Sequence, residues 1–268
     1  MDYECKAESG LQLLARLSSR PDIHGLDEKL FSGGLHFGDV VEITGDIGSG
    51  KTLLITQLLA KCLLPKSMFE IDIGGLGAGA IIINSDHHFQ LLKLVSIMES
   101  TFEENQQLDS STIEKIIKTA LANLIVLNCY DRVQLLVTFH SLDNILSSNK
   151  NISLIVVDSL SAFYWQDIVI SGIHKMDFYL KKTLKTLQSC IQEHKIVIIY
   201  TKQAHFVSKI NFVPESSKSV LGNITHRVQL NRMEGKGTES LCVAEITTLN
   251  SECTVPYRLT GEGLMWSS

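Results

Sequence analysis

The chain has 268 residues, of which 44% are hydrophobic and 20% charged, and its formal net charge is -5. This length suits one large α/β domain or two small ones with a sizeable core. The acidic balance excludes DNA binding that relies on overall positive charge, but it leaves room for a local basic groove.

The cysteines and the N-terminal residues bear on the compartment. No C-x-x-C pair occurs among the six cysteines, which we interpret as reduced, mostly buried thiols of an intracellular protein. Residues 1–6 are polar and acidic, unlike a signal peptide. The apolar runs are too short to span a bilayer, so we expect a soluble protein without a membrane partner.

The first 38 residues are expected to form a short helix and a lead-in segment. Within residues 7–17, Leu11, Leu14 and Leu17 have helical spacing, and Pro21 then breaks the pattern. We expect residues 39–268 to form the core domain.

A phosphate-binding loop pattern stands between a predicted strand at residues 39–44 and a predicted helix at residues 52–64. The pattern is G-x-x-x-x-G-K-T and comprises Gly45, Asp46, Ile47, Gly48, Ser49, Gly50, Lys51 and Thr52. Its glycines let backbone N–H groups turn towards phosphate oxygens, and its lysine is expected to reach the β- and γ-phosphates. We expect the Thr52 hydroxyl to bind Mg²⁺. The helix N-terminus behind the loop also favours an anion.

A glycine-rich stretch at residues 74–79 precedes the next predicted strand, at residues 80–84. A dinucleotide-binding loop follows a strand, so we interpret this stretch as a flexible connector. Helices and strands then alternate along the chain, with helices predicted at residues 88–99, 113–121, 133–148 and 179–192 and strands at residues 124–127, 154–157 and 196–200.

This alternation predicts a mostly parallel sheet with helices on both faces. Short strands at residues 227–231, 241–247 and 255–259 have hairpin spacing and are expected to extend the sheet with antiparallel strands. The phosphate loop would then lie at the carboxyl ends of the central strands. Residues 204–221 lack periodicity and predict a long loop, either functional or disordered.

Three polar residues at strand ends are candidates for the rest of the site. Asp158 ends an apolar strand, as expected of a second Mg²⁺-organising carboxylate, although Asp also serves turns there. Asp86 is a candidate for activating water and equally a candidate helix N-cap, and the two roles are compatible. Gln203 follows the strand at residues 196–200 and is a candidate sensor of the γ-phosphate.

With these motifs in place, the chain resembles the RecA-type recombinase core over almost its whole length. The matching motifs are the phosphate loop, residues 84–86, residues 157–159 and Gln203. The C-terminal segments that resemble the sheet of eukaryotic recombinases and their paralogues are residues 222–227, 234–237 and 260–264.

The resemblance implies a RecA-like P-loop ATPase core that binds ATP and Mg²⁺. It also implies a nuclear role in homologous recombination repair, as a subunit of a paralogue complex that helps load or stabilise the main recombinase on single-stranded DNA. The partners would be other recombinase paralogues, with single-stranded or branched DNA contacted mainly through the complex. By position, two loops would line the DNA channel, at residues 165–174 and 204–221.

The chain departs from that family pattern in its N-terminal part and at one catalytic position. Full-length recombinases carry an N-terminal DNA-binding domain and a linker with a Phe-x-x-Ala hook, whereas 44 residues precede Gly45 here. We therefore expect a terminal subunit that accepts a neighbour's linker without donating one. The usual catalytic Glu is replaced by Asp86, which is one methylene shorter, so rapid hydrolysis is not expected.

The expected DNA loops are poor in positive charge. The first has no Lys or Arg, and the second has Lys209 and Lys218 against Glu215. Because phosphate contacts dominate affinity, autonomous DNA binding should be weak. Trp165 and Phe206 are candidates for stacking on bases, but we favour packing roles for both.

Three hypotheses follow from these observations. The first is a weakly catalytic or non-catalytic, ATP-binding subunit of a recombination-mediator complex. The second is a self-sufficient DNA-stimulated ATPase that performs strand exchange, which Asp86 and the uncharged first loop argue against. The third is a scaffold without nucleotide, which the intact Lys51, Thr52 and Asp158 argue against.

Overall fold

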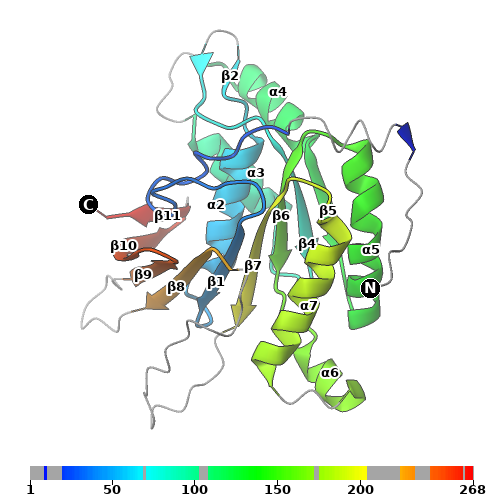
Figure 1. Cartoon of the computed structure of the whole chain (residues 1–268). Coiled ribbons are helices and arrows are strands. Elements are labelled where there is room, and N and C mark those ends of the chain that lie inside the picture. The colour runs from blue at the N-terminus through cyan, green and yellow to red at the C-terminus, as the bar shows by residue number, and fades with distance from the viewer. Residues whose placement is uncertain are drawn as a thin grey trace.

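A nine-stranded, mostly parallel sheet runs through the molecule and carries helices on both of its faces (Figure 1). It is seen in a computed structural model that describes residues 9–10, 20–68, 71–102, 108–171, 175–203, 224–232, 242–261 and 263–267. Apart from residues 9–10, the predicted N-terminal helix lies outside these described ranges, as do residues 204–223 with the basic residues among them.

The strands are β1 (Val40–Gly45), β2 (Ser67–Met68), β3 (Ile71–Asp72), β4 (Gly79–Asn84), β5 (Leu124–Asn128), β6 (Ile152–Asp158), β7 (Val197–Gln203), β8 (His226–Arg232), β9 (Cys242–Thr248), β10 (Glu252–Thr260) and β11 (Gly263–Trp266). The helices are α2 (Lys51–Leu63), α3 (Leu91–Ser100), α4 (Ser110–Leu121), α5 (Arg132–Ser148), α6 (Tyr164–Ser171) and α7 (Met176–Ile191).

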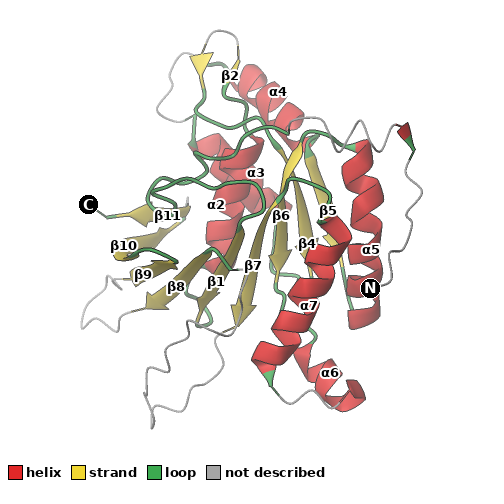
Figure 2. Ribbon diagram, viewed as in Figure 1, coloured by secondary structure: helices red, strands yellow, loops and turns green. Residues whose placement is uncertain are grey.

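The order of the large sheet is β11-β10-β9-β8-β1-β7-β6-β4-β5, which places β1 at its centre (Figure 2). Six strands, from β8 to β5 in this order, are parallel, and β9, β10 and β11 add antiparallel pairs. The prediction of a parallel sheet with antiparallel strands at its C-terminal end is therefore confirmed. Two details differ, because β8 runs parallel to β1 and β11 was not predicted.

The parallel strands are buried on both faces, which explains their continuous apolar runs. On β4, Ile82 packs in the cluster that includes α2, α3 and α4, whereas Ile81 and Ile83 pack in the cluster that includes α5 and α7. On β1, Val41 and Ile43 face the first cluster and Val40 faces the second. This sandwich of helices and sheet fixes where each strand ends, and therefore where the site residues stand.

The connector at residues 73–78 is not the flexible segment that its glycines suggested. The Gly77 N–H donates to Leu64 O at 2.8 Å, and the Ala78 N–H donates to Cys62 O at 2.9 Å. Four further N–H groups, from residues 73 to 76, donate to carbonyls of residues 61–66. A Cβ atom at Gly75 would lie 2.0 Å from Leu64 O, so glycine is required for close approach to the end of α2 rather than for mobility.

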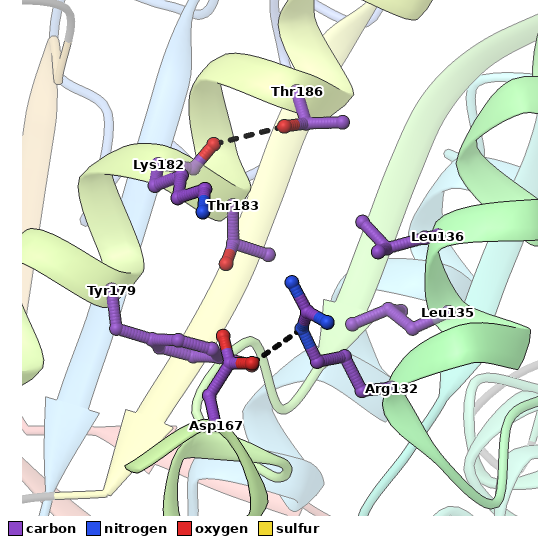
Figure 3. A pocket seen from close by; sticks show the side chains of 8 residues that line it. All are labelled: Arg132, Leu135, Leu136, Asp167, Tyr179, Lys182, Thr183 and Thr186. Carbon is purple, nitrogen blue, oxygen red and sulfur yellow. Dashed lines mark hydrogen bonds and ion pairs between the residues drawn. The ribbon is translucent and has the colours of Figure 1, made fainter. Parts of the chain in front are cut away.

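The region expected to form the first DNA loop is also different. Its described part is helical, because α6 covers Tyr164–Ser171. Asp167 of this helix is buried and pairs with Arg132 of α5, with 2.5 Å between Oδ1 and Nε. Figure 3 shows this pair beside Tyr179 at a cavity of about 20 Å³, which is room for about one water. The ion pair ties α6 to the α5–α7 layer.

Candidate functional site: a phosphate loop beside two strand-end carboxylates

The phosphate loop joins the end of β1 to the start of α2, as predicted. Gly48 and Gly50 have φ angles of 79° and 96°, a left-handed conformation that favours glycine. Within the described structure, no side chain caps the N-terminus of α2 and no acidic residue lies in its first turn. The N–H groups at this helix start, together with the helix dipole, therefore suit an anion.

Lys51 lies over the loop that it belongs to. Its Nζ atom donates to Gly45 O at 2.7 Å and to Asp46 O at 2.9 Å. Burial lowers the pKa of Lys51, and the nearby carboxylates of Asp158, Asp46 and Asp86 oppose that shift. The arrangement holds an ammonium group where phosphate oxygens would approach the helix start.

Thr52 and Asp158 meet although 106 positions separate them. The Thr52 hydroxyl donates to Asp158 Oδ2 at 2.9 Å, and the Thr201 hydroxyl donates to Asp158 Oδ1 at 2.6 Å. Asp158 is buried at the end of β6, and Thr201 lies on β7, the adjacent strand. A hydroxyl and a carboxylate at one point are oxygen donors of the kind Mg²⁺ takes when phosphates supply other ligands, so these residues fit a Mg²⁺–nucleotide.

Asp86 also reaches this cluster, from the end of β4. Its N–H donates to Asp158 O at 3.0 Å, and the Gln203 side chain is close enough to influence the pKa of its carboxylate. Burial, and secondarily the charge of Asp158, raise the pKa of Asp86, while His88, Gln203 and Lys51 act in the opposite direction. The Asp86 carboxylate therefore lies among polar groups that include Lys51 of the phosphate loop.

The helix-cap interpretation of Asp86 is wrong. α3 begins at Leu91 with Gln90 as its N-cap, three residues later than the predicted start at His88. The intervening residues turn away from β4, and His87 there has φ 57° and stacks on Tyr130 with ring centroids 4.5 Å apart. Asp86 is thus separated from the helix that it was expected to cap.

A line of serine hydroxyls connects the end of β6 to Gln203. Ser85 Oγ donates to Ser159 O at 2.8 Å, and the hydroxyls of Ser159 and Ser161 are 2.8 Å apart. The Gln203 N–H donates to Ser161 Oγ at 3.1 Å. The structure therefore brings together every predicted site residue, and it adds Thr201 and these serines, which sequence reasoning did not assign.

Of the site residues that sequence reasoning missed, Thr201 could have been found from its position near a strand end. Thr201 is two positions before Gln203, and the meeting of parallel strand ends at one edge could have placed it beside Asp158.

Trp165 was interpreted as a packing residue, but it is 66% exposed, so that interpretation is wrong. The other aromatic residue of that expectation, Phe206, lies outside the described residues.

Fold and loop together define a P-loop core of the RecA type, with a phosphate loop at the centre of a mostly parallel sheet. The sequence model of the Rad51 family matches residues 22–266. The chain belongs to the Rad51 family, which is a family of nucleotide-binding ATPases.

Two curated relatives share a name that concerns DNA repair. The chain is 36% identical to the DNA repair protein XRCC2 of Mus musculus, over 74% of this chain and 69% of the mouse protein. It is 24% identical to the DNA repair protein XRCC2 homolog of Arabidopsis thaliana, over 73% of this chain and 63% of that protein. The chain described here therefore has a role as a recombinase paralogue in DNA repair by homologous recombination.

Other relatives share the fold at lower identity. The DNA repair protein RAD51 of Saccharomyces cerevisiae is 27% identical over 80% of this chain, which spans 51% of the yeast protein. The crystal structure of the RadB recombinase superposes with a TM-score of 0.62 at 23% identity, covering 88% of this chain and 94% of the RadB chain. The chain thus spans from about half to about two thirds of the curated relatives named here.

Proposed function

We propose that this chain is an ATP-holding, slowly hydrolysing subunit of a nuclear complex of Rad51 paralogues that assists recombinase loading and filament stability on single-stranded DNA. One observation carries the proposal. The phosphate loop and Mg²⁺ residues converge, with Thr52 and Asp158 2.9 Å apart beside Lys51, while the neighbouring strand end offers the short carboxylate of Asp86.

The proposed nucleotide roles follow from this geometry. The backbone of Gly45–Thr52 and the Lys51 ammonium hold the phosphates, and Thr52 with Asp158 holds Mg²⁺ through the nucleotide. Bound Mg²⁺ neutralises phosphate charge and so supports any hydrolysis that occurs. These residues bind and orient the nucleotide.

The water-activating side of the site supports only slow hydrolysis. We propose that Asp86 orients the attacking water and that Gln203 senses the γ-phosphate. Asp86 is one methylene shorter than the Glu that the family usually has at this position, so its carboxylate reaches less far towards the attacking water. A base held short of the water is a poor match for rapid proton abstraction.

We further propose that the edge strand β5 accepts a linker strand from a neighbouring paralogue. Ala80 N–H donates to Asn123 O, and Cys129 N–H donates to Asn84 O. In this parallel ladder, the backbone groups of the even-numbered residues Leu124, Val126 and Asn128 therefore point away from β4. Among the described strands, none pairs with this edge, so it is open to strand addition.

One apolar side chain at this edge is partly exposed. Val126 of β5 is 39% exposed. Thr138 of α5 lies 3.3 Å from the thiol of Cys129, directly after β5, which places the helix against the strand end. An extended peptide would find backbone partners on β5 and an apolar contact at Val126.

We propose that DNA contact arises mainly through the complex. The described part of the first DNA region, α6, has no Lys or Arg between Trp165 and Ser171. The helix therefore lacks the cations that dominate phosphate affinity.

Within the described ranges, no helix combines the length and apolar composition needed to cross a bilayer.

The decisive experiment combines co-purification with nucleotide measurements. We expect a stable heteromer with other Rad51 paralogues, ATP–Mg²⁺ binding, and a turnover well below about 1 s⁻¹ with or without DNA. A turnover at or above that rate by the chain alone would favour the self-sufficient strand-exchange ATPase. Paralogue binding without ATP binding would favour a scaffold.

A further inference from the structure

The hairpin formed by β10 and β11 contacts the phosphate loop directly. The Tyr257 hydroxyl donates to Ser49 O at 2.7 Å across 208 positions, and both residues are buried. Burial raises the pKa of the Tyr257 hydroxyl, so it remains a donor at neutral pH. Because Ser49 is 1% exposed, water has little access to replace this hydrogen bond.

The same hairpin also covers the loop with apolar side chains. A Cβ atom at Gly50 would lie 2.5 Å from Leu259 Cδ2 and 3.5 Å from Leu264 Cδ1. The φ of 96° at Gly50 favours glycine, and the Leu259 side chain packs over the position that a Cβ atom would take. The hairpin thus sets the space in which the last turn of the loop lies.

Two further tethers fix the hairpin relative to the helices behind the loop. The Leu264 N–H donates to Gln57 Oε1 of α2 at 2.8 Å. The Lys93 ammonium of α3 donates to Gly261 O at the hairpin turn. The hairpin is therefore attached to α2 and α3 as well as to the loop that begins α2.

We propose that the β10–β11 hairpin is a buttress that holds the phosphate loop in its anion-binding curvature, with Tyr257 as the positioning residue. The inference rests on the proposed function, in which this loop holds a nucleotide. Tyr257 acts through the Ser49 carbonyl, which orients the peptide groups that follow it at the start of α2. By linkage, nucleotide binding also stabilises the hairpin.

The test compares Tyr257→Phe with Tyr179→Phe. Both changes remove one hydroxyl from a fully buried tyrosine, but Tyr179 lies on α7 beside the Arg132–Asp167 pair (Figure 3), in the α5–α7 cluster, whereas Tyr257 packs in the cluster that includes α2. The probes are Mg²⁺–ATP and Mg²⁺–tripolyphosphate, which has no base or sugar. We expect Tyr257→Phe to weaken binding of both probes by the same factor, about fivefold for one lost hydrogen bond, and Tyr179→Phe to leave both unchanged.

Hydrogen exchange on the nucleotide-free protein supplies a second readout. We expect Tyr257→Phe, but not Tyr179→Phe, to speed exchange of the Ser49 amide, which donates to Asp46 O at 3.2 Å. If wild-type protein binds both probes and Tyr257→Phe changes neither affinity nor loop exchange, the buttress is overturned. Weakening for ATP alone would also overturn it, because the hairpin would then act on the nucleoside.

The two proposals fail in distinguishable ways. If the wild-type protein binds neither probe, the nucleotide part of the proposed function fails. The exchange rates of the loop still decide the buttress in that case, because they are measured without ligand. Unchanged rates in Tyr257→Phe would overturn it, and faster rates confined to the loop would support it.

Discussion

The two edge strands of the sheet, β5 and β11, differ in what their outward-facing groups contact. At one edge, β5 is a parallel strand whose outward backbone groups meet no described strand. At the other, β11 is a four-residue strand whose Leu264 N–H donates to Gln57 Oε1 and whose last residue, Trp266, donates from Nε1 to Asp27 Oδ2 at 3.1 Å. We propose that the first edge receives another chain and that the second supports the phosphate loop from within the chain.

This difference teaches that nucleotide holding and partner binding can be separated. The two edges lie on opposite sides of a sheet nine strands wide, with β1 and its loop at the centre. Substitutions at distant positions without shared contacts usually act independently. Changes near the loop should therefore alter nucleotide binding alone, and changes at β5 should alter partner binding alone.

The largest expected effect is that of Lys51→Ala. Loss of the ammonium over the loop should weaken ATP–Mg²⁺ binding about 100-fold, since charge-assisted hydrogen bonds to phosphate are among the stronger ones. Isothermal titration measures this, with Lys61→Ala in the last turn of the same helix as the control. Paralogue co-purification should be unchanged. Loss of the partner would show that nucleotide organises the interface and would break the comparison.

Val126→Pro should have the next largest effect, on the partner. Proline removes an N–H that points away from β4 and is tolerated on edge strands, so the fold should persist. We expect paralogue affinity to fall about tenfold while ATP affinity is unchanged, as surface plasmon resonance and titration can measure. Val126→Ala keeps the N–H and should cost less. Equal losses in the two variants would point to side-chain contact instead of strand addition.

Asp86→Asn should have the smallest effect, on stability. Burial and Asp158 raise the pKa of Asp86, so its charged form is unfavourable in the fold and the neutral amide should raise Tm slightly at pH 7. This advantage should fade as pH falls through the folded pKa and vanish below the unfolded value, where the wild-type carboxyl is also neutral. Calorimetry across pH 3–8 checks the sign, and a lower Tm for the variant at pH 7 would contradict it.

Local patterns predicted much of the fold and the site. The loop from Gly45 to Thr52, the apolar run ending at Asp158 and the strand ending near Gln203 each carry a signal within a few residues. Parallel strands bring such ends to one edge, so convergence of the site also followed. The direction of β8 did not follow, because hairpin spacing alone does not state which strand a segment joins first.

Other features depend on contacts between distant parts of the chain, which a single sequence does not display. Tyr257 meets Ser49 across 208 positions, and although Ser49 belongs to the phosphate-loop pattern, no motif marks Tyr257 as its partner. Likewise, α6 is tied down by Asp167 and Arg132, whereas the resemblance to recombinases had suggested a loop there. Glycine content misled at residues 74–79, because glycine serves close approach as well as freedom of motion.

That connector has a practical consequence for protein engineering. A glycine-rich surface segment is the usual choice for inserting an epitope tag or a fluorescent reporter. Here, consecutive N–H groups donate to carbonyls of residues 61–66, at the end of α2 and just after it, and Gly75 lies against the Leu64 carbonyl. An insertion between Gly74 and Gly77 would break these hydrogen bonds and leave carbonyl groups at the end of α2 without their donors. The turn at Asn250, between β9 and β10, is a safer insertion point, since its neighbour Leu249 is 86% exposed.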